Sequence, residues 1–144
     1  MNTPKVSIII PTARAKDSRF KLLESLSIQT MGNFEVIVVF RTLLLEDKRE
    51  LQKKYPKLKL LLVEQKHPGL VSARNTGIDY ATGEITVFTD DDITPVKNWL
   101  KEINLSFNNT QVGGVSGPTI IPKGFLDNRD LLSFFEKKIQ ISIH

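Results

Sequence analysis

The chain has 144 residues, of which 40% are apolar and 25% charged, with a formal net charge of +4 and a pI near 9.4. These values are typical of one soluble globular domain, and nothing in them indicates disorder. Because cysteine is absent, disulfides and thiolate sites are excluded, and a metal ion would need oxygen or His ligands. No apolar run is long enough to span a membrane, and Pro11 interrupts the first one. We therefore expect a cytoplasmic chain.

The positive net charge suits an anionic partner: a nucleic acid, a membrane surface or a phosphorylated substrate. The densest basic segment, residues 53–59, lies between a predicted helix and a predicted strand. It lacks the interleaved aromatic side chains of proteins that bind single-stranded nucleic acids. We expect a solvated helix end there and no nucleic-acid partner, and we keep peripheral association with the cytoplasmic membrane face as an alternative.

As far as residue 88, the chain alternates buried strands with amphipathic helices. β-branched and apolar runs predict strands at residues 5–10, 34–40, 58–63 and 84–88. Helical spacing of apolar residues predicts helices from Asp17 or Ser18 to residue 28, and over residues 44–55 and 70–81. Pro11 is expected to end the first strand and to open a loop over residues 11–16.

The rest of the chain continues the alternation. Thr94 and Pro95 predict the N-cap and first residue of a helix that reaches Phe107. A glycine-bearing strand follows at residues 112–121 and a final helix at residues 127–141. This order predicts a three-layer α/β/α sandwich with a mostly parallel central sheet, as a single domain over residues 1–144. The last helix or a second copy of the chain is expected to cover the last strand, so a homo-oligomer is one alternative.

Three adjacent carboxylates, Asp90, Asp91 and Asp92, follow the fourth predicted strand. Neighbouring carboxylates repel one another unless a cation keeps them ionised, and Mg²⁺ or Mn²⁺ suits such a cluster. Ligands of open parallel sheets bind outside the carboxyl ends of the strands, which is where these acids lie. The position favours a metal site, and an exposed acidic turn is the alternative.

Two other loops are predicted to reach the same edge of the sheet. Pro11, Thr12 and Arg14 follow the first strand, either as part of a ligand crevice or as an ordinary loop. Arg74 and Asn75 lie near the start of a helix, where the helix dipole favours an anion such as a phosphate. A surface Arg74 paired with a nearby acid, Asp79 or Glu64, is the alternative.

Five motifs then occur in a recognisable order. They are VSIIIPT near the start, FEVIVV in the second strand, GLVSARNTG in the third helix, ATGE leading into FTDDD, and VGGVSGP near residue 115. Over about residues 5–120 this order resembles the inverting family 2 glycosyltransferases, which have the GT-A (nucleotide-diphospho-sugar transferase) fold.

The resemblance implies a metal-dependent transferase with a nucleotide-diphosphate sugar as donor and an unknown saccharide or lipid-linked acceptor. The Asp-x-Asp motif of the family maps to Asp90 and Asp92, which would bind Mg²⁺ or Mn²⁺. The residues implied to bind the nucleotide sugar are Pro11, Thr12, Arg14, Arg74, Asn75, Asp90 and Asp91.

Two departures from the family pattern limit these implications. Phe40 and Arg41 stand where members usually carry an acid that reads the base, so the sequence does not name the nucleotide. One alternative is that Glu46 or Asp47 reaches back and contacts the base in place of the missing acid.

The second departure is the general base, which in the family is a carboxylate well downstream of the Asp-x-Asp motif. The acids available here, Asp127, Asp130 and Glu136, fit solvated positions of the last helix better. We expect a chain that lacks the base and the acceptor-binding part. Two functions stay open: a glycosyltransferase or its donor-binding portion, and a non-catalytic, truncated GT-A module that acts as a binding or scaffold subunit.

Overall fold

The computed structural model of the chain describes residues 3–13 and 16–118, with the backbone alone for residues 16–20. The chain divides after Gly113 into two compact units, and residues 114–118 are the described part of the second. The prediction of a single domain over residues 1–144 stays a prediction. The predicted helix over residues 127–141 lies outside the described residues. The predicted strand at 112–121 is wrong in its described part, because residues 112–118 form no strand.

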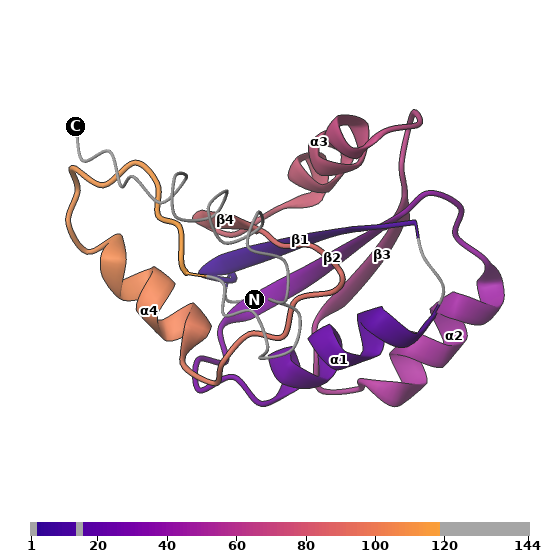
Figure 1. Cartoon of the computed structure of the whole chain (residues 1–144), viewed down its shortest axis with the longest axis horizontal. Coiled ribbons are helices and arrows are strands. Elements are labelled where there is room, and N and C mark those ends of the chain that lie inside the picture. Colours follow the sequence, from indigo (N-terminus) through magenta and orange to yellow (C-terminus); the bar gives the residue numbers. More distant parts are fainter. Residues whose placement is uncertain (1–2, 14–15, 119–144) are drawn as a thin grey trace, which may run out of the picture. The chain divides into compact units, whose positions relative to one another are not determined.

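A parallel sheet of four strands forms the centre of the first unit (Figure 1). Its strands are β1 (Val6–Thr12), β2 (Phe34–Phe40), β3 (Leu60–Glu64) and β4 (Ile85–Phe88), in the order β3-β2-β1-β4. β1 and β2 pair along their whole length, from Val6 opposite Phe34 to Thr12 opposite Phe40. The predicted parallel sheet is therefore confirmed.

Helices cover both faces of this sheet. The helix α3 (Leu70–Tyr80) lies on one face. The helices α1 (Lys16–Ser27), α2 (Leu45–Lys54) and α4 (Trp99–Ser106) lie on the other (Figure 1). This arrangement confirms the predicted three-layer sandwich.

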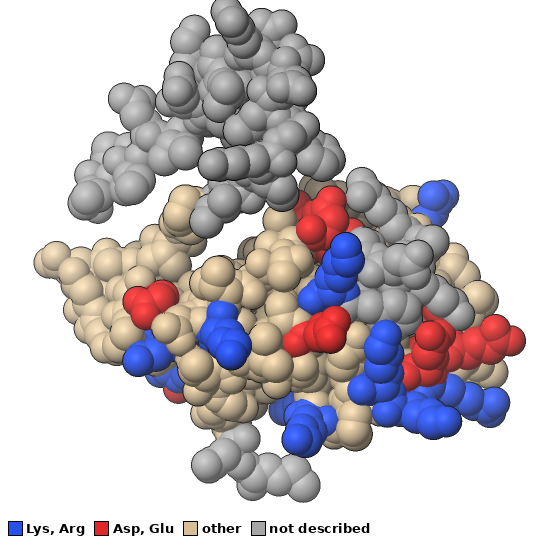
Figure 2. Space-filling view, turned by 60° about the horizontal axis from the view of Figure 1, so that its bottom comes forward, with Lys and Arg blue, Asp and Glu red and all other residues tan. Residues whose placement is uncertain are grey.

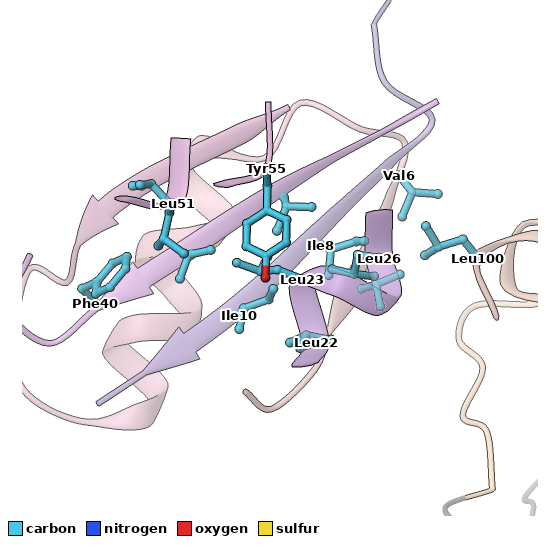
Figure 3. Close-up of a cluster of buried hydrophobic side chains, with 14 of the residues drawn as sticks. Val6, Ile8, Ile10, Leu22, Leu23, Leu26, Phe40, Leu51, Tyr55 and Leu100 are labelled. Carbon is cyan, nitrogen blue, oxygen red and sulfur yellow. The ribbon is translucent and has the colours of Figure 1, made fainter. Parts of the chain in front are cut away.

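The alternation of side chains along each strand divides the core between the two faces. Ile8 and Ile10 of β1 point toward α1, α2 and α4, and they join a buried cluster with Leu22, Leu51 and Leu100 of these helices (Figure 3). The intervening Ile9 points toward α3 and packs with a second cluster of buried residues, Ile37, Val39, Val63 and Ala73. Each fully buried aliphatic side chain contributes about 1.5–3 kcal/mol to folding, so β1 anchors both layers.

The expectation that Pro11 ends the first strand is wrong, because β1 continues through Pro11 to Thr12. The carbonyl of Ile9 accepts a hydrogen bond from Thr89 on the β4 side, and the carbonyl of Thr12 accepts one from Arg41 on the β2 side. By alternation, the missing N–H of Pro11 faces the β4 side, beyond the end of that strand. The proline therefore costs the sheet no hydrogen bond, and the strand carries Thr12 to the sheet edge.

The predicted helix start at Thr94–Pro95 is also wrong, since α4 begins at Trp99. The side chain of Gln29, which follows α1, donates to the carbonyl of Val96 at 2.8 Å and accepts from the amide of Leu100 at 3.1 Å. The backbone amide of Thr30 also donates to the carbonyl of Lys97 at 3.0 Å. These contacts take up the backbone groups before Trp99, so tertiary contacts override the local Thr-Pro signal.

A buried carboxylate fixes the amino ends of the strands, opposite the predicted site. Glu35 is 4% exposed and its Oε1 accepts hydrogen bonds of 2.8 Å from the hydroxyl of Ser7 and from the amide and hydroxyl of Thr82. Its Oε2 lies 2.8 Å from the Lys59 ammonium. Burial raises the pKa of Glu35, but the hydrogen bonds from Lys59, Thr82 and Ser7 outweigh it and lower the pKa to about 2. The network therefore ties β1, β2 and the turn before β4 together.

The surface of the α1, α2 and α4 side carries both signs of charge. Figure 2 shows Lys and Arg side chains interspersed with Asp and Glu among the described residues there. Within the described residues, no helix is both long and apolar enough to cross a membrane.

Candidate functional site

A pocket of about 580 Å³ lies at the carboxyl ends of the strands. It collects the residues after all four strands and the start of α3, as expected for the ligand crevice of a parallel sheet. Its lining consists of Pro11, Thr12, Ala13, Arg41, Gln65, Gly69, Leu70, Ala73, Asp90, Asp91 and Asp92. The acidic turn after β4 thus faces the same space as the ends of β1, β2 and β3.

The three acids of this turn have different environments. Asp91 is 7% exposed, and its Oδ2 accepts a hydrogen bond of 2.7 Å from the Thr12 hydroxyl, which is itself buried. Asp90 and Asp92 are exposed at the pocket. All three acids line the pocket; the middle one is buried and held by Thr12, and the outer two are exposed.

Arg74 reaches the acidic turn from the first half of α3. Its Nη2 lies 3.6 Å from Asp90 Oδ1, and its guanidinium lies 6.0 Å from the centre of the Phe88 ring. Its Nε is buried, and no hydrogen-bond partner for it is found within the described residues. The pairing of Arg74 with Asp79 or Glu64 is not observed, because Asp79 pairs with Lys66 and Glu64 accepts from the Leu43 amide.

The loop before α3 is held to that helix by hydrogen bonds. The amide of Lys66 donates to the Thr76 hydroxyl at 3.3 Å, and the amide of His67 donates to the Ser72 hydroxyl at 3.1 Å. Gly69 then turns the chain into the helix with φ of 113°, a conformation that side-chain-bearing residues rarely adopt. This turn places Gly69 and Leu70 on the wall of the pocket.

The donor set can be compared with the needs of a divalent cation. Across residues 3–13 and 16–118, no cluster of three or more His, Cys, Asp or Glu side chains is placed to hold a metal ion. The two exposed carboxylates of Asp90 and Asp92 instead suit Mg²⁺ or Mn²⁺, which are commonly held by one or two carboxylates and completed by phosphate oxygens and water. The residues present therefore fit an ion that binds together with an anionic ligand.

The predicted site residues are brought together in part. Pro11, Thr12, Asp90 and Asp91 line the pocket, as does the predicted metal ligand Asp92. Arg74 touches Asp90 beside it, whereas Asn75 is exposed on α3 and does not line it. Arg14 lies outside the described residues. Glu46 and Asp47, considered as substitutes for the base-reading acid, do not line the pocket.

Several lining residues were not predicted as ligand contacts, namely Arg41, Gln65, Gly69 and Leu70. Arg41 and Gln65 directly follow β2 and β3, so their position at the carboxyl ends of strands was the available signal. In the sequence, Arg41 is marked only as a departure from a family pattern.

The family model described as Glycosyl transferase family 2 matches residues 7–142. The chain belongs to this family. The glycosyltransferase AglE of Haloferax volcanii is 33% identical over 119 residues, which are 79% of this chain and 39% of that protein. The uncharacterized glycosyltransferase YwdF of Bacillus subtilis is 35% identical over 108 residues, 69% of this chain and 38% of that protein.

Solved structures of glycosyltransferases share the fold. The mannosyltransferase PcManGT from Pyrobaculum calidifontis, in complex with GDP-Man and Mn²⁺, has a TM-score of 0.73 and 29% identity over 83% of this chain and 36% of its own. S. aureus TarS 1–349 in complex with UDP-GlcNAc has a TM-score of 0.63 and 26% identity over 87% of this chain and 42% of its own. The GT-A fold predicted for this family member is confirmed, and the chain spans less than half the length of these relatives.

Proposed function

We propose that the pocket binds a nucleotide-diphosphate sugar together with Mg²⁺ or Mn²⁺, and that the chain serves inverting transfer of the sugar to a saccharide or lipid-linked acceptor. The observation that carries this proposal is the difference in burial among the three acids of the turn. Thr12 holds Asp91 inward, so Asp90 and Asp92 are the carboxylates presented at the carboxyl edge of the sheet. Two carboxylates fill only part of the coordination shell of such a cation, and the phosphate oxygens of a nucleoside diphosphate can fill more of it.

Each residue around the turn has a distinct part in this proposal. Asp90 and Asp92 hold the cation, which when bound neutralises charge on the diphosphate leaving group. Arg74, whose guanidinium lies near the Phe88 ring and contacts Asp90, offers N–H donors to the same diphosphate. The Thr12–Asp91 hydrogen bond keeps the turn in place for both.

The solved neighbours support a nucleotide-sugar donor and leave its identity open. PcManGT is complexed with GDP-Man and Mn²⁺, and TarS 1–349 with UDP-GlcNAc. One neighbour thus carries a guanine nucleotide and the other a uracil nucleotide. The fold is compatible with either base.

The test is thermal stabilisation of the 144-residue chain by nucleoside diphosphates with and without Mg²⁺ or Mn²⁺. A ligand that binds only the folded state raises the melting temperature. We expect a rise that needs both the nucleotide and the metal and that Asp92→Asn abolishes. Glu84→Gln is the matched control, because Glu84 is an exposed carboxylate that pairs with Lys5 at the opposite edge of the sheet. A metal-independent rise, or none with any nucleotide, would overturn the proposal.

A non-catalytic donor-binding module predicts the same stabilisation but no turnover. Hydrolysis or transfer of a nucleotide sugar by the purified chain separates the two functions. Turnover that Asp92→Asn removes would establish the transferase, and binding without turnover under every donor and acceptor would favour the module.

A further inference from the structure

Among the described residues that line the pocket, Arg41 is the one with a positively charged side chain. The acids of the lining follow β4, whereas Arg41 directly follows β2, two strands away in the order β3-β2-β1-β4. Neighbouring strands lie about 4.8 Å apart, so the acidic and basic ends of the pocket are separated by roughly 10 Å at the backbone. The pocket is therefore acidic at one end and basic at the other.

The backbone of Arg41 is held in place. Its amide donates to the carbonyl of Thr12 at 3.1 Å, which extends the β1–β2 pairing by one residue. The carbonyl of Phe40, just before it, accepts from the amide of Gln65 at 2.8 Å, and the amide of Leu43, two residues after it, donates to the Glu64 carboxylate at 3.1 Å. The start of this loop is thus fixed to the strands on both sides, which gives the Arg41 side chain a defined origin.

No ion pair involves the Arg41 guanidinium within the described residues, and the nearby Glu64 carboxylate is engaged by the Leu43 amide. An exposed arginine at the wall of a pocket, without an acid of its own, has its five N–H donors available to a ligand. Because arginine carries no acceptor, it selects ligand edges that present acceptors side by side.

We propose that Arg41 selects the base of the nucleotide in favour of guanine or cytosine; this inference rests on the proposed function. With its diphosphate at Asp90 and Asp92, a donor extends along the lining toward the ends of β2 and β3. The sugar must face an acceptor, so the nucleoside is the part that occupies the end backed by Gln65 and Leu70. Its base then meets the Arg41 guanidinium.

The chemistry of the bases gives the selection. Guanine presents O6 and N7 as adjacent acceptors, the edge that arginine binds in a bidentate manner. Cytosine presents O2 and N3 as a similar pair. Uracil places the N3–H donor between its two carbonyls, and adenine places the N6 amino group beside N7 and N1, so each opposes a guanidinium with a donor.

The described lining also lacks an aromatic ring, so its flat contacts come from small or aliphatic residues such as Pro11, Leu70 and Ala73. Stacking on an aromatic side chain accepts every base, whereas hydrogen bonds to the base edge discriminate among them. We therefore expect the polar side chains of this pocket to determine which base it prefers. Among them, Arg41 has the most strictly oriented hydrogen-bond donors.

The test is calorimetric titration of the chain with GDP, CDP, UDP and ADP in the presence of Mg²⁺. We expect GDP or CDP to bind on the order of tenfold more tightly than UDP and ADP, as a bidentate arginine contact would give. Arg41→Gln should abolish the preference for GDP and CDP, because glutamine offers a donor and an acceptor and so no longer selects an edge with two adjacent acceptors. Arg41→Lys should keep the overall affinity but reduce the preference, because lysine keeps the charge without the planar fork.

Arg49→Gln is the matched control, since Arg49 lies on α2 and does not line the pocket. Equal binding of the four nucleotides by the unmodified chain would overturn the role of Arg41 while leaving the proposed function intact. An equal loss for all four in Arg41→Gln would overturn it too, by assigning Arg41 to the shared diphosphate. Failure of every nucleotide to bind would overturn the proposed function and this inference with it.

Discussion

The Thr12 hydroxyl donates a 2.7 Å hydrogen bond to Asp91 Oδ2 and so joins the end of β1 to the turn after β4. β1 and β4 pair only from Val6 to Ile9, so this side-chain bond continues the connection beyond the last strand pair. Both residues are buried, and their separation in the sequence makes the contact purely tertiary. It explains how three like charges fit in one turn, since the middle one is turned inward.

Replacement of Thr12 by valine tests this contact. Valine has nearly the same shape but no hydroxyl, so Asp91 loses a hydrogen bond in a buried position. We expect the free energy of unfolding to fall by about 1–3 kcal/mol and metal-dependent nucleotide binding to weaken. Thr12→Ser, which keeps the hydroxyl, is the control in the same chemical denaturation and calorimetric measurements. Equal stability of the valine and serine variants would contradict the contact's importance.

Substitutions of the three acids in the turn should affect folding stability and nucleotide binding differently. We expect Asp91→Ala to lower the free energy of unfolding, because the buried Thr12 hydroxyl then loses the acceptor of its hydrogen bond. Asp90→Asn and Asp92→Asn change exposed side chains, so their stability should stay within about 0.5 kcal/mol while metal-dependent nucleotide binding is lost. Denaturation and titration of the three variants under identical conditions give the comparison. A uniform loss of both properties in all three would refute the division.

Glu35 should make the fold sensitive to acid. Its pKa falls from 4.5 to about 2 on folding, so the folded state holds the carboxylate ionised more strongly than the unfolded chain does. This contribution, about 3 kcal/mol, is present above pH 4.5 and is lost as the pH falls from 4.5 toward 2. Glu35→Gln should be less stable at neutral pH and should lose less stability across that window.

Urea denaturation at neutral pH and at several values between 4.5 and 2 measures this difference. Glu84→Gln serves as the control, because its carboxylate is exposed and its pairing with Lys5 contributes little. Parallel stability curves for Glu35→Gln and the unmodified chain would show that another acid causes the pH dependence.

The sheet and the acidic end of the site could be predicted because they depend on local patterns. Continuous β-branched runs such as Ile8–Ile10 indicate buried parallel strands, and parallel strands bring their carboxyl ends to one edge. That reasoning predicts Thr12 and Asp90 at the same edge. It did not reveal that Asp91 is buried against Thr12, because the contact depends on how far β1 extends past Pro11.

The failures have the same origin in tertiary contacts. The start of α4 depends on Gln29, which lies 71 residues before Leu100 and has no local signal there. The place of Arg41 in the pocket depends on the pairing of β2 with β1, and comparison with a family pattern marked it only as a missing acid. Sequence patterns of short range therefore predicted the elements, and side-chain bonds between elements decided where they begin and end.

The close approach of α3 to the sheet gives a prediction about packing. A Cβ on Gly77 would lie 2.3 Å from Cγ2 of Ile9, a residue fully buried in the centre of β1. We expect Gly77→Ala to lower the free energy of unfolding by about 1–3 kcal/mol, because α3 or Ile9 must shift. Gly32→Ala is the control, since no heavy atom lies within 4 Å of a Cβ there. Chemical denaturation that gave equal values for the two variants would contradict this close packing.

Arg74 should matter for binding far more than for folding. Its contact with Asp90 is 3.6 Å long between side chains that are 40% and 63% exposed, and ion pairs of this kind contribute at most about 1 kcal/mol. Its donors are nevertheless aimed at the acidic turn, where we place the diphosphate. We expect Arg74→Gln to leave the free energy of unfolding nearly unchanged and to weaken every nucleoside diphosphate equally, by roughly tenfold, as for the loss of a charged hydrogen bond. This uniform loss contrasts with the base-dependent loss expected for Arg41→Gln. Titration of both variants with GDP and UDP therefore separates a residue that holds phosphates from one that selects the base, and a base-dependent loss at Arg74 would reverse the two assignments.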